Sequence, residues 1–348
     1  MSEILSLAGS NLLSPIILSF ALGLAAAMAR SDLSIPEAVA KGLSVYLLFA
    51  IGFKGGVAVS AHGVDTTLVL SLLAGLLLSF GLPLIAFALL RVMTRLGTVD
   101  AAAVAAHYGS ISIVTFVAAT SVLAGRGIAS EGYLVAVAAV MEAPAILSAL
   151  WLVARNGGVG GPGGGHAGAG AAVATGAPAP VRTGIDPELL REILLNGSIV
   201  LLVGAFLIGA LTGEPGLAEI APFIVAPFKG VLCLFLLDMG LIAGRGLRGA
   251  RGVLGLGAVG FAILMPLIGA AIGLGAGVAV GLSTGGTMLL MTLSASASYI
   301  AVPAAMRVAL PEAKPSIYLT LSLGVTFPFN LTLGIPLYLA LASAATGG

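Results

Sequence analysis

Long apolar stretches alternate with short polar or glycine-rich connections along almost the whole chain. Each stretch is close to the ~20 residues that an α-helix needs to cross the hydrocarbon core of a bilayer. The pattern predicts an all-α integral membrane protein with ten transmembrane helices. They lie at residues 10–29, 38–60, 66–90, 101–123, 132–154, 194–212, 223–243, 253–275, 277–299 and 316–342. No positively charged region precedes the first, so we interpret it as a retained helix and not as a signal peptide.

The two halves of the chain share short motifs in the same order. Phe20–Gly23 corresponds to Phe206–Gly209, and Met141–Pro144, in the last span of the first half, corresponds to Val325–Pro328 in the last span of the second. Because each half holds five spans, the second half must enter the bilayer upside down. Inverted five-helix repeats of this kind are typical of secondary transporters, which hold substrate and coupling ion where the repeats meet.

A segment rich in glycine, alanine and proline separates the two halves. It contains too little apolar surface to form a packed unit, so we expect a flexible cytoplasmic linker. The predicted organisation is a first repeat at residues 1–155, the linker at 156–184 and a second, inverted repeat at 185–348.

Composition supports a membrane protein and disfavours other classes. Hydrophobic residues make up 59% of the 348 positions and charged residues 8%, which leaves too little polar surface for a soluble globule. The single cysteine, Cys233, argues against a disulfide framework and a cysteine-based metal site. No basic cluster with interleaved aromatic residues indicates nucleic-acid binding. No nucleophile–base pair or metal-ligand cluster at membrane depth indicates an enzyme.

The distribution of positive charge predicts the orientation in the membrane. If the N-terminus lies outside, only Arg126 falls in an external connection, whereas twelve cationic residues fall on cytoplasmic ends or loops. Cytoplasmic loops of membrane proteins carry such an excess of Lys and Arg. Both termini are therefore expected on the extracytoplasmic side. The twelve residues are Arg30, Lys41, Arg91, Arg95, Arg155, Arg182, Arg191, Arg245, Arg248, Arg251, Arg307 and Lys314.

The fourth span of each half contains glycine and hydroxyl residues where a lipid-facing helix is usually apolar. They occur at His107–Ser112 and at Ser283–Thr287. Glycine weakens a helix, and hydroxyl groups replace backbone hydrogen bonds that an opened helix loses. A broken helix exposes N–H groups and a positive dipole end that suit a small anion. Close packing of helices through small residues is the alternative. The candidate substrate-binding residues are Gly109, Ser110, Ser112, Gly285, Gly286 and Thr287.

Glu142 is the most informative ionisable residue, because it lies midway along the fifth span. A charged side chain at that depth costs at least ~2.5 kcal/mol on insertion scales and therefore needs a partner or a function. A carboxylate with hydroxyl and amide oxygens suits a hard cation such as Na⁺. A protonated, hydrogen-bonded structural role is the alternative. The candidate sodium ligands are Glu142, Thr115, Ser294, Ser296, Ser298 and Asn330.

Three further polar residues lie at membrane depth. Lys54 is explained by snorkelling toward an external helix end, or else attracts an anion there. Asp238 is a candidate for a lysine partner or a polar network. His107 has no other metal-ligand type beside it in the sequence, which favours a satisfied core histidine over a metal ligand or proton relay.

The chain resembles the SbtA-type sodium-dependent bicarbonate transporters. The likeness is carried by Gly52–Gly56, Met141–Ala145, Pro303–Arg307 and Leu333–Leu337, and it extends in the same order through nearly the whole chain. It implies a homotrimer in a bacterial plasma (inner) membrane. It also implies a gate domain of spans one, two, six and seven, a moving core domain of the other six, and a cytoplasmic PII-like regulatory partner. The chain departs from the family at Glu142 and at Ser298–Ile300, where members carry aspartate.

These observations predict a secondary active transporter that couples Na⁺ entry to uptake of bicarbonate or a similar small anion, without a cofactor. Sodium at Glu142 would lock the broken spans and complete the anion site. Two alternatives stay open. One is a Na⁺/H⁺ antiporter of similar fold, in which Glu142 exchanges the two cations. The other is a membrane receptor or scaffold whose linker and partner matter more than flux.

Overall fold

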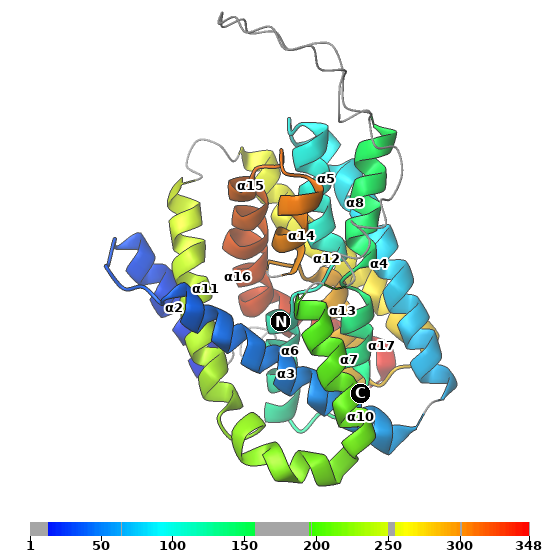
Figure 1. The fold of residues 1–348 in the computed structure, drawn as a ribbon. Coiled ribbons are helices and arrows are strands. Elements are labelled where there is room, and N and C mark those ends of the chain that lie inside the picture. Colours follow the sequence, from blue (N-terminus) through cyan, green and yellow to red (C-terminus); the bar gives the residue numbers. More distant parts are fainter. Residues whose placement is uncertain are drawn as a thin grey trace, which may run out of the picture.

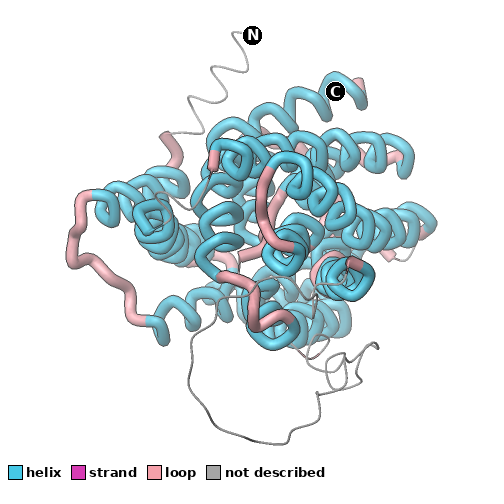
Figure 2. The backbone as a smooth tube through the Cα atoms, turned by 90° about the horizontal axis from the view of Figure 1, so that it is seen from above, coloured by secondary structure: helices cyan, strands magenta, loops and turns pink. Residues whose placement is uncertain are grey.

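The computed structural model describes residues 13–63, 65–156, 195, 197–249, 255–299 and 301–347. Within these ranges every regular element is a helix, as Figures 1 and 2 show. The all-α expectation is therefore confirmed for the described part of the chain. The predicted linker lies outside the described residues except for Asn156, and so does the start of the first predicted span, residues 10–12.

Eight stretches of the described chain are long and apolar enough to cross a membrane. The helix α2 has 14 residues and is shorter than a full span, while α13 and α14 have 12 and 9. The elements are α2 (Pro15–Met28), α3 (Glu37–His62), α4 (Thr66–Met93), α5 (Thr98–Gly109), α6 (Ile113–Gly125), α7 (Leu134–Val140), α8 (Pro144–Arg155), α10 (Gly197–Ile224), α11 (Phe228–Gly249), α12 (Leu256–Val280), α13 (Thr284–Ala295), α14 (Ala301–Ala309), α15 (Pro315–Leu319), the π-helix η1 (Thr320–Thr326), α16 (Phe327–Phe329), the π-helix η2 (Asn330–Gly334) and α17 (Ile335–Thr346).

Two helix pairs from opposite halves of the chain pack unusually closely. α2 lies against α11, and α3 lies against α10. A Cβ atom at Gly23 would lie 2.0 Å from the carbonyl oxygen of Leu237, and one at Gly56 would lie 1.9 Å from that of Phe206. Small residues allow such approach of two backbones, which is how helices associate where lipid removes the hydrophobic driving force. These four helices form one group, called the outer group below.

The other helices form a second group with two similar halves. α4 packs on α5 as α12 packs on α13, and α5 packs on α8 as α13 packs on α17. α4 and α12 also contact each other. The centre of this group is α5 and α13, because residues 101–109 and 285–295 are all buried. Alanine and glycine in both helices let their neighbours surround them on every side.

Breaks within spans confirm one expectation and correct another. The fourth span is interrupted at Ser110–Ser112, as expected. The ninth is not interrupted at Ser283–Thr287, because the Ser283 side chain accepts a hydrogen bond from the Gly286 N–H and caps the start of α13. Its extended segment is Ser296–Ser298 instead, so that this span is α13 and α14 and not residues 277–299.

The fifth and sixth spans also differ from the prediction. The fifth span is interrupted by turns at Met141–Ala143, just before Pro144. The predicted external connection after the sixth span is also helical: α10 consists of two helices that meet at a kink at Gly213, with φ of 59°, and the second ends at Ile224. A positive φ costs glycine little, which explains why the kink between the two helices lies at this residue.

Candidate functional site

The two broken helices cross at their interruptions. α5 and α13 come from opposite ends of the bundle, and α6 and α14 continue beyond the breaks (Figure 1). The N–H of Ser298 donates to the carbonyl oxygen of His107 at 2.7 Å. The N–H of Ser112 donates to the hydroxyl of Ser296 at 2.9 Å. Each break thus supplies an acceptor for a backbone group that the other break leaves without its helical partner.

Four helix ends point at this crossing. α5 and α13 bring carbonyl ends, which carry partial negative charge, and α6 and α14 bring N–H ends, which carry partial positive charge. The start of α6 is capped by Ser112, whose Oγ accepts from the Thr115 N–H at 3.2 Å and from the Thr115 hydroxyl at 2.9 Å. Since Ser112 accepts both times, its own hydroxyl hydrogen is left to donate. The crossing therefore offers partial charges of both signs.

Buried polar atoms without hydrogen-bond partners gather around the crossing. The described residues contain five such side-chain atoms, and three belong to residues in or next to the breaks: Ser110 Oγ, the Tyr299 hydroxyl and His107 Nε2. A fourth is Glu142 Oε2, in the break of the fifth span. Leaving a buried polar group unpaired costs about 1–3 kcal/mol, more for a charged group. Groups of this kind are explained by a ligand, water or ion that completes them.

Glu142 is connected to the crossing through α4. The residue is 4% exposed, and its neighbour Met141 accepts a hydrogen bond from the Ser79 hydroxyl at 2.6 Å. Ser79 and Pro83 lie against Gly109, where a Cβ atom would be 2.1 Å from the proline ring. One turn of α4 thus separates the two breaks. In the described residues no hydrogen bond joins Glu142 to another of the predicted sodium ligands.

The hydroxyl groups predicted to bind sodium differ in their surroundings. Ser296 donates to the Leu293 carbonyl at 2.9 Å in addition to its bond with Ser112. Ser294 donates to the Leu290 carbonyl in its own helix at 2.9 Å. Ser298 accepts from the Val302 N–H at 3.4 Å, at the start of α14. Their oxygen atoms retain lone pairs that a cation can use.

Asn330 and Tyr338 of the last span, and Tyr108 of α5, connect the last span to the crossing and to α12. Asn330 Nδ2 donates to the Ala295 carbonyl at 2.9 Å, at the end of α13, and its Oδ1 accepts from the Tyr338 hydroxyl at 2.7 Å. Thr326 donates to the Ala262 carbonyl, so the Tyr108 hydroxyl at 2.7 Å must donate to Thr326. Sequence reasoning missed the roles of both tyrosines, although each is a polar residue within an apolar span.

The predicted substrate-binding residues do not all meet. Gly109, Ser110 and Ser112 lie at the crossing, whereas Gly285, Gly286 and Thr287 lie at the other end of α13, roughly 15 Å away at 1.5 Å per residue. The second set faces an acidic residue. Glu131 accepts from the Ser283 N–H at 2.7 Å and from the Ser283 hydroxyl at 2.9 Å. The negative charge at this helix start is therefore supplied by the chain itself.

His107 and Lys54 differ from their expected environments. His107 Nδ1 lies 2.6 Å from the Ala103 carbonyl and must carry the proton there, while the ring stacks on Tyr318 with centroids 4.5 Å apart. Its Nε2 is then an acceptor without a partner among the described residues, so the histidine is only partly satisfied there. The Lys54 ammonium lies 4.3 Å from the centre of the Phe228 ring, a cation–π contact between α3 and α11.

Comparison with known proteins now gives the chain a family. A search of the curated proteins finds no match. A family model described as the Na⁺-dependent bicarbonate transporter superfamily matches residues 15–343. This match spans both halves, the crossing and Glu142. The chain therefore belongs to the Na⁺-dependent bicarbonate transporter superfamily.

Proposed function

We propose that the protein carries bicarbonate, or a similar small anion, into the cell together with Na⁺ by alternating access. The observation that carries this proposal is the crossing of two broken helices surrounded by unpaired buried polar atoms. The family supports both the sodium dependence and the anion. Substrate and ion sites at interrupted helices are the general design of secondary transporters.

The anion site is assigned to the hydroxyl donors of the crossing. Within the described residues Ser110 Oγ has no hydrogen-bond partner, and the Ser112 hydroxyl, which keeps its own hydrogen, lies close to the Tyr299 hydroxyl. Hydroxyl donors beside the N-terminus of α6 match the acceptor oxygens of bicarbonate, and the helix dipole favours its negative charge. Gly109 keeps a place in this site because it lets α4 approach the break. We retain Gly285, Gly286 and Thr287 only as a second, separate candidate site near Glu131.

Sodium is assigned to Glu142 with oxygen atoms from the crossing. Thr115, Ser294, Ser296, Ser298 and Asn330 remain its proposed partners. An ionised Glu142 without a partner in a buried place is costly, and a bound cation removes that cost. Anion binding nearby is then more favourable with sodium present, and by linkage the anion strengthens sodium binding equally. This reciprocity is the thermodynamic basis of symport.

The alternating-access part of the proposal rests on how the two helix groups meet. We propose ten spans in two inverted repeats, with the outer group as gate and the second group as core. The contacts among α4, α5 and α8 match those among α12, α13 and α17, and this similarity supports the repeat. Small residues lie between the groups, where Gly55 faces Val135 and Gly132 faces Ala58.

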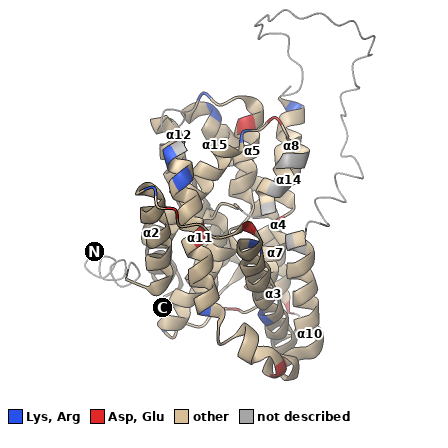
Figure 3. Ribbon diagram, turned by 60° about the vertical axis from the view of Figure 1, so that its left-hand side comes forward, with Lys and Arg blue, Asp and Glu red and all other residues tan. Residues whose placement is uncertain are grey.

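Assembly, location and orientation belong to the same proposal. We propose a homotrimer in a bacterial inner membrane with both termini outside. A PII-like regulator is the proposed cytoplasmic partner. Figure 3 shows most Lys and Arg segments near the end of the bundle that holds α5, α8 and α15, which supports a cytoplasmic position for that end.

Uptake of labelled bicarbonate into proteoliposomes tests the function directly. An inward sodium gradient should accelerate uptake, whereas an equal potassium gradient should not. Sodium-independent uptake, or none, would contradict symport. A pH-sensitive dye trapped in the same vesicles distinguishes the antiporter, because sodium-driven alkalinisation or acidification without bicarbonate would favour H⁺ exchange at Glu142.

A further inference from the structure

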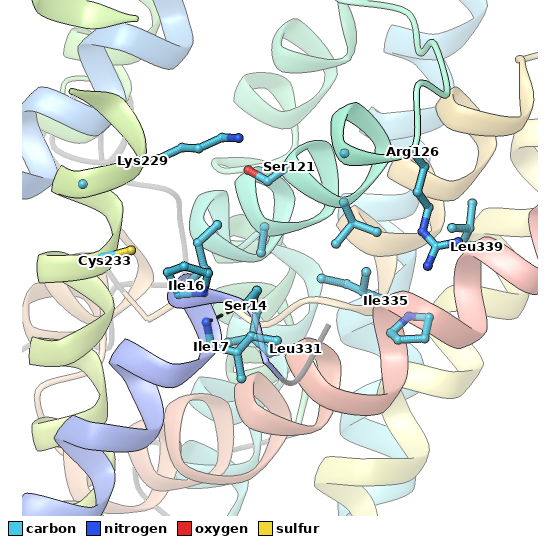
Figure 4. Close-up of a pocket in the computed structure, with 16 residues that line it drawn as sticks. Ser14, Ile16, Ile17, Ser121, Arg126, Lys229, Cys233, Leu331, Ile335 and Leu339 are labelled. Carbon is cyan, nitrogen blue, oxygen red and sulfur yellow. Dashed lines mark hydrogen bonds between the residues drawn. The ribbon is translucent and has the colours of Figure 1, made fainter. Parts of the chain in front are cut away.

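A cavity of about 630 Å³ lies between the outer group and the core group. α2 and α11 form one wall, and α6 and α17 form the other (Figure 4). Most of the lining is apolar, for example Ile16, Val122 and Leu339. Its position between two groups that are proposed to move against each other makes it a place where access to the crossing can change.

The charges of this cavity are all positive. Lys229, at the start of α11, and Arg126, at the end of α6, line it from opposite walls, and no Asp or Glu is among its lining residues. Both side chains are exposed, and neither forms an ion pair within the part of the chain that the structure describes. Two uncompensated cations between low-dielectric walls raise the local concentration of anions.

The inner end of the cavity approaches the crossing. Ala118 lies six residues beyond Ser112 on α6, which is about 9 Å along the helix at 1.5 Å per residue. Leu331 directly follows Asn330, which holds the end of α13. The cavity therefore extends from the two cations to within about two turns of α6 from the proposed anion site.

We propose that this cavity is the external vestibule for the substrate anion, in which Lys229 and Arg126 collect bicarbonate before it reaches Ser110 and Ser112. The inference rests on the proposed function and adds to it the route of access and the residues that govern it. The cavity is far larger than one bicarbonate ion, so the vestibule gathers hydrated anions and does not bind one tightly. Its effect is on apparent affinity at low ionic strength.

The chain provides its own probe of the vestibule. Cys233 is the single cysteine in the sequence and lines the cavity. Two membrane-impermeant methanethiosulfonates of similar size, one carrying a sulfonate and one a trimethylammonium group, should be added outside to reconstituted protein. Each forms a mixed disulfide with the Cys233 thiolate and releases methanesulfinate. Their rate ratio is then compared with the ratio for free 2-mercaptoethanol.

The vestibule predicts that the anionic reagent reacts at least about threefold faster than that reference ratio, and that 0.5 M salt removes the preference. Lys229→Gln and Arg126→Gln should each reduce the preference for the anionic reagent. The same variants should raise the bicarbonate KM about threefold to tenfold at low salt, with an unchanged maximal rate. Lys229→Arg keeps the positive charge and should have the KM of the wild-type protein. Lys41→Gln, at the other end of the bundle, is the matched control.

Two outcomes overturn the vestibule. One is equal modification by both reagents while sodium-driven uptake is intact. The other is a clear anionic preference with no change of KM in the variants, which would mean that the cavity serves a different anion. If wild-type protein shows no sodium-driven bicarbonate uptake, the proposed function fails instead, whatever the modification rates are.

Discussion

The hydroxyl of Ser296 accepts a hydrogen bond from the backbone N–H of Ser112, 184 residues earlier in the chain, at a distance of 2.9 Å. This contact joins the two interruptions around which the proposed sites are arranged. The contact also stabilises the crossing, because the Ser112 N–H is buried and has no acceptor in its own helix.

Replacing Ser296 by alanine should destabilise the protein and impair transport. The buried Ser112 N–H would lose its acceptor, at a cost of about 1–3 kcal/mol. The melting temperature in detergent should fall, and the sodium concentration for half-maximal uptake should rise. Ser294→Ala is the matched control for stability, since in the described part of the chain that hydroxyl bonds only to Leu290 of its own helix. An unchanged melting temperature in Ser296→Ala would show that the contact does not hold the crossing.

Replacing Glu142 by glutamine should abolish stimulation of uptake by sodium. The amide has nearly the shape of the carboxylate but cannot neutralise a cation, so sodium binding is lost while folding is preserved. Glu142→Asp should retain sodium dependence with weaker affinity. The exposed Glu219→Gln serves as a control. Sodium titrations of labelled bicarbonate uptake make the measurement, and wild-type sodium dependence in Glu142→Gln would remove this residue from the site.

Replacing Gly56 by alanine should separate α3 from α10. The new Cβ atom would lie 1.9 Å from the Phe206 carbonyl oxygen, and backbone cannot yield as a flexible side chain does. We expect a lower yield of folded protein and a melting temperature several degrees lower. Gly42→Ala, in the same helix, has no atom within 4 Å of its Cβ and should be tolerated. Equal stability of the two variants would contradict the close packing of this pair.

Replacing Glu131 by alanine should weaken the start of α13. The carboxylate accepts two hydrogen bonds from Ser283 beside a positive helix end, and loss of such capping costs about 1 kcal/mol. Stability should fall, whereas the KM for bicarbonate should stay unchanged if the anion binds at Ser110 and Ser112. A markedly altered KM would instead support the second candidate site at Gly285–Thr287. The exposed Glu312→Ala controls for loss of a carboxylate.

The break in the fourth span could be predicted from sequence because glycine and serine cluster at the place where the helix opens. The same rule misplaced the break in the ninth span by about ten residues. A hydroxyl followed by glycines marks a capped helix start as well as an interruption, and Ser283 caps α13. The contacts that distinguish the two in the structure include those of Ser283 with Glu131, which is distant in sequence.

The sequence predicted part of the candidate site, because residue type alone marks some of its members. Residue type identified Ser110, Ser112 and Glu142, since polar groups at membrane depth are expensive. It could not identify Tyr299 or Tyr338, whose importance lies in what they face. Contacts such as that between Tyr108 and Thr326 join residues 218 positions apart and depend on the packing of whole helices. No local pattern records them.

The wide turns of the last span fix its register. A π-turn closes each backbone bond one residue later than an α-turn, and the stretch from Pro315 to Thr346 contains two such segments, on either side of Phe327–Phe329. Tightening either segment into an α-helix would rotate Thr326 away from Ala262 or Asn330 away from Ala295. Two hydrogen bonds, from Thr326 to Ala262 and from Asn330 to Ala295, therefore hold the last span at two points along its length. Rotation of the whole span requires both bonds to break together.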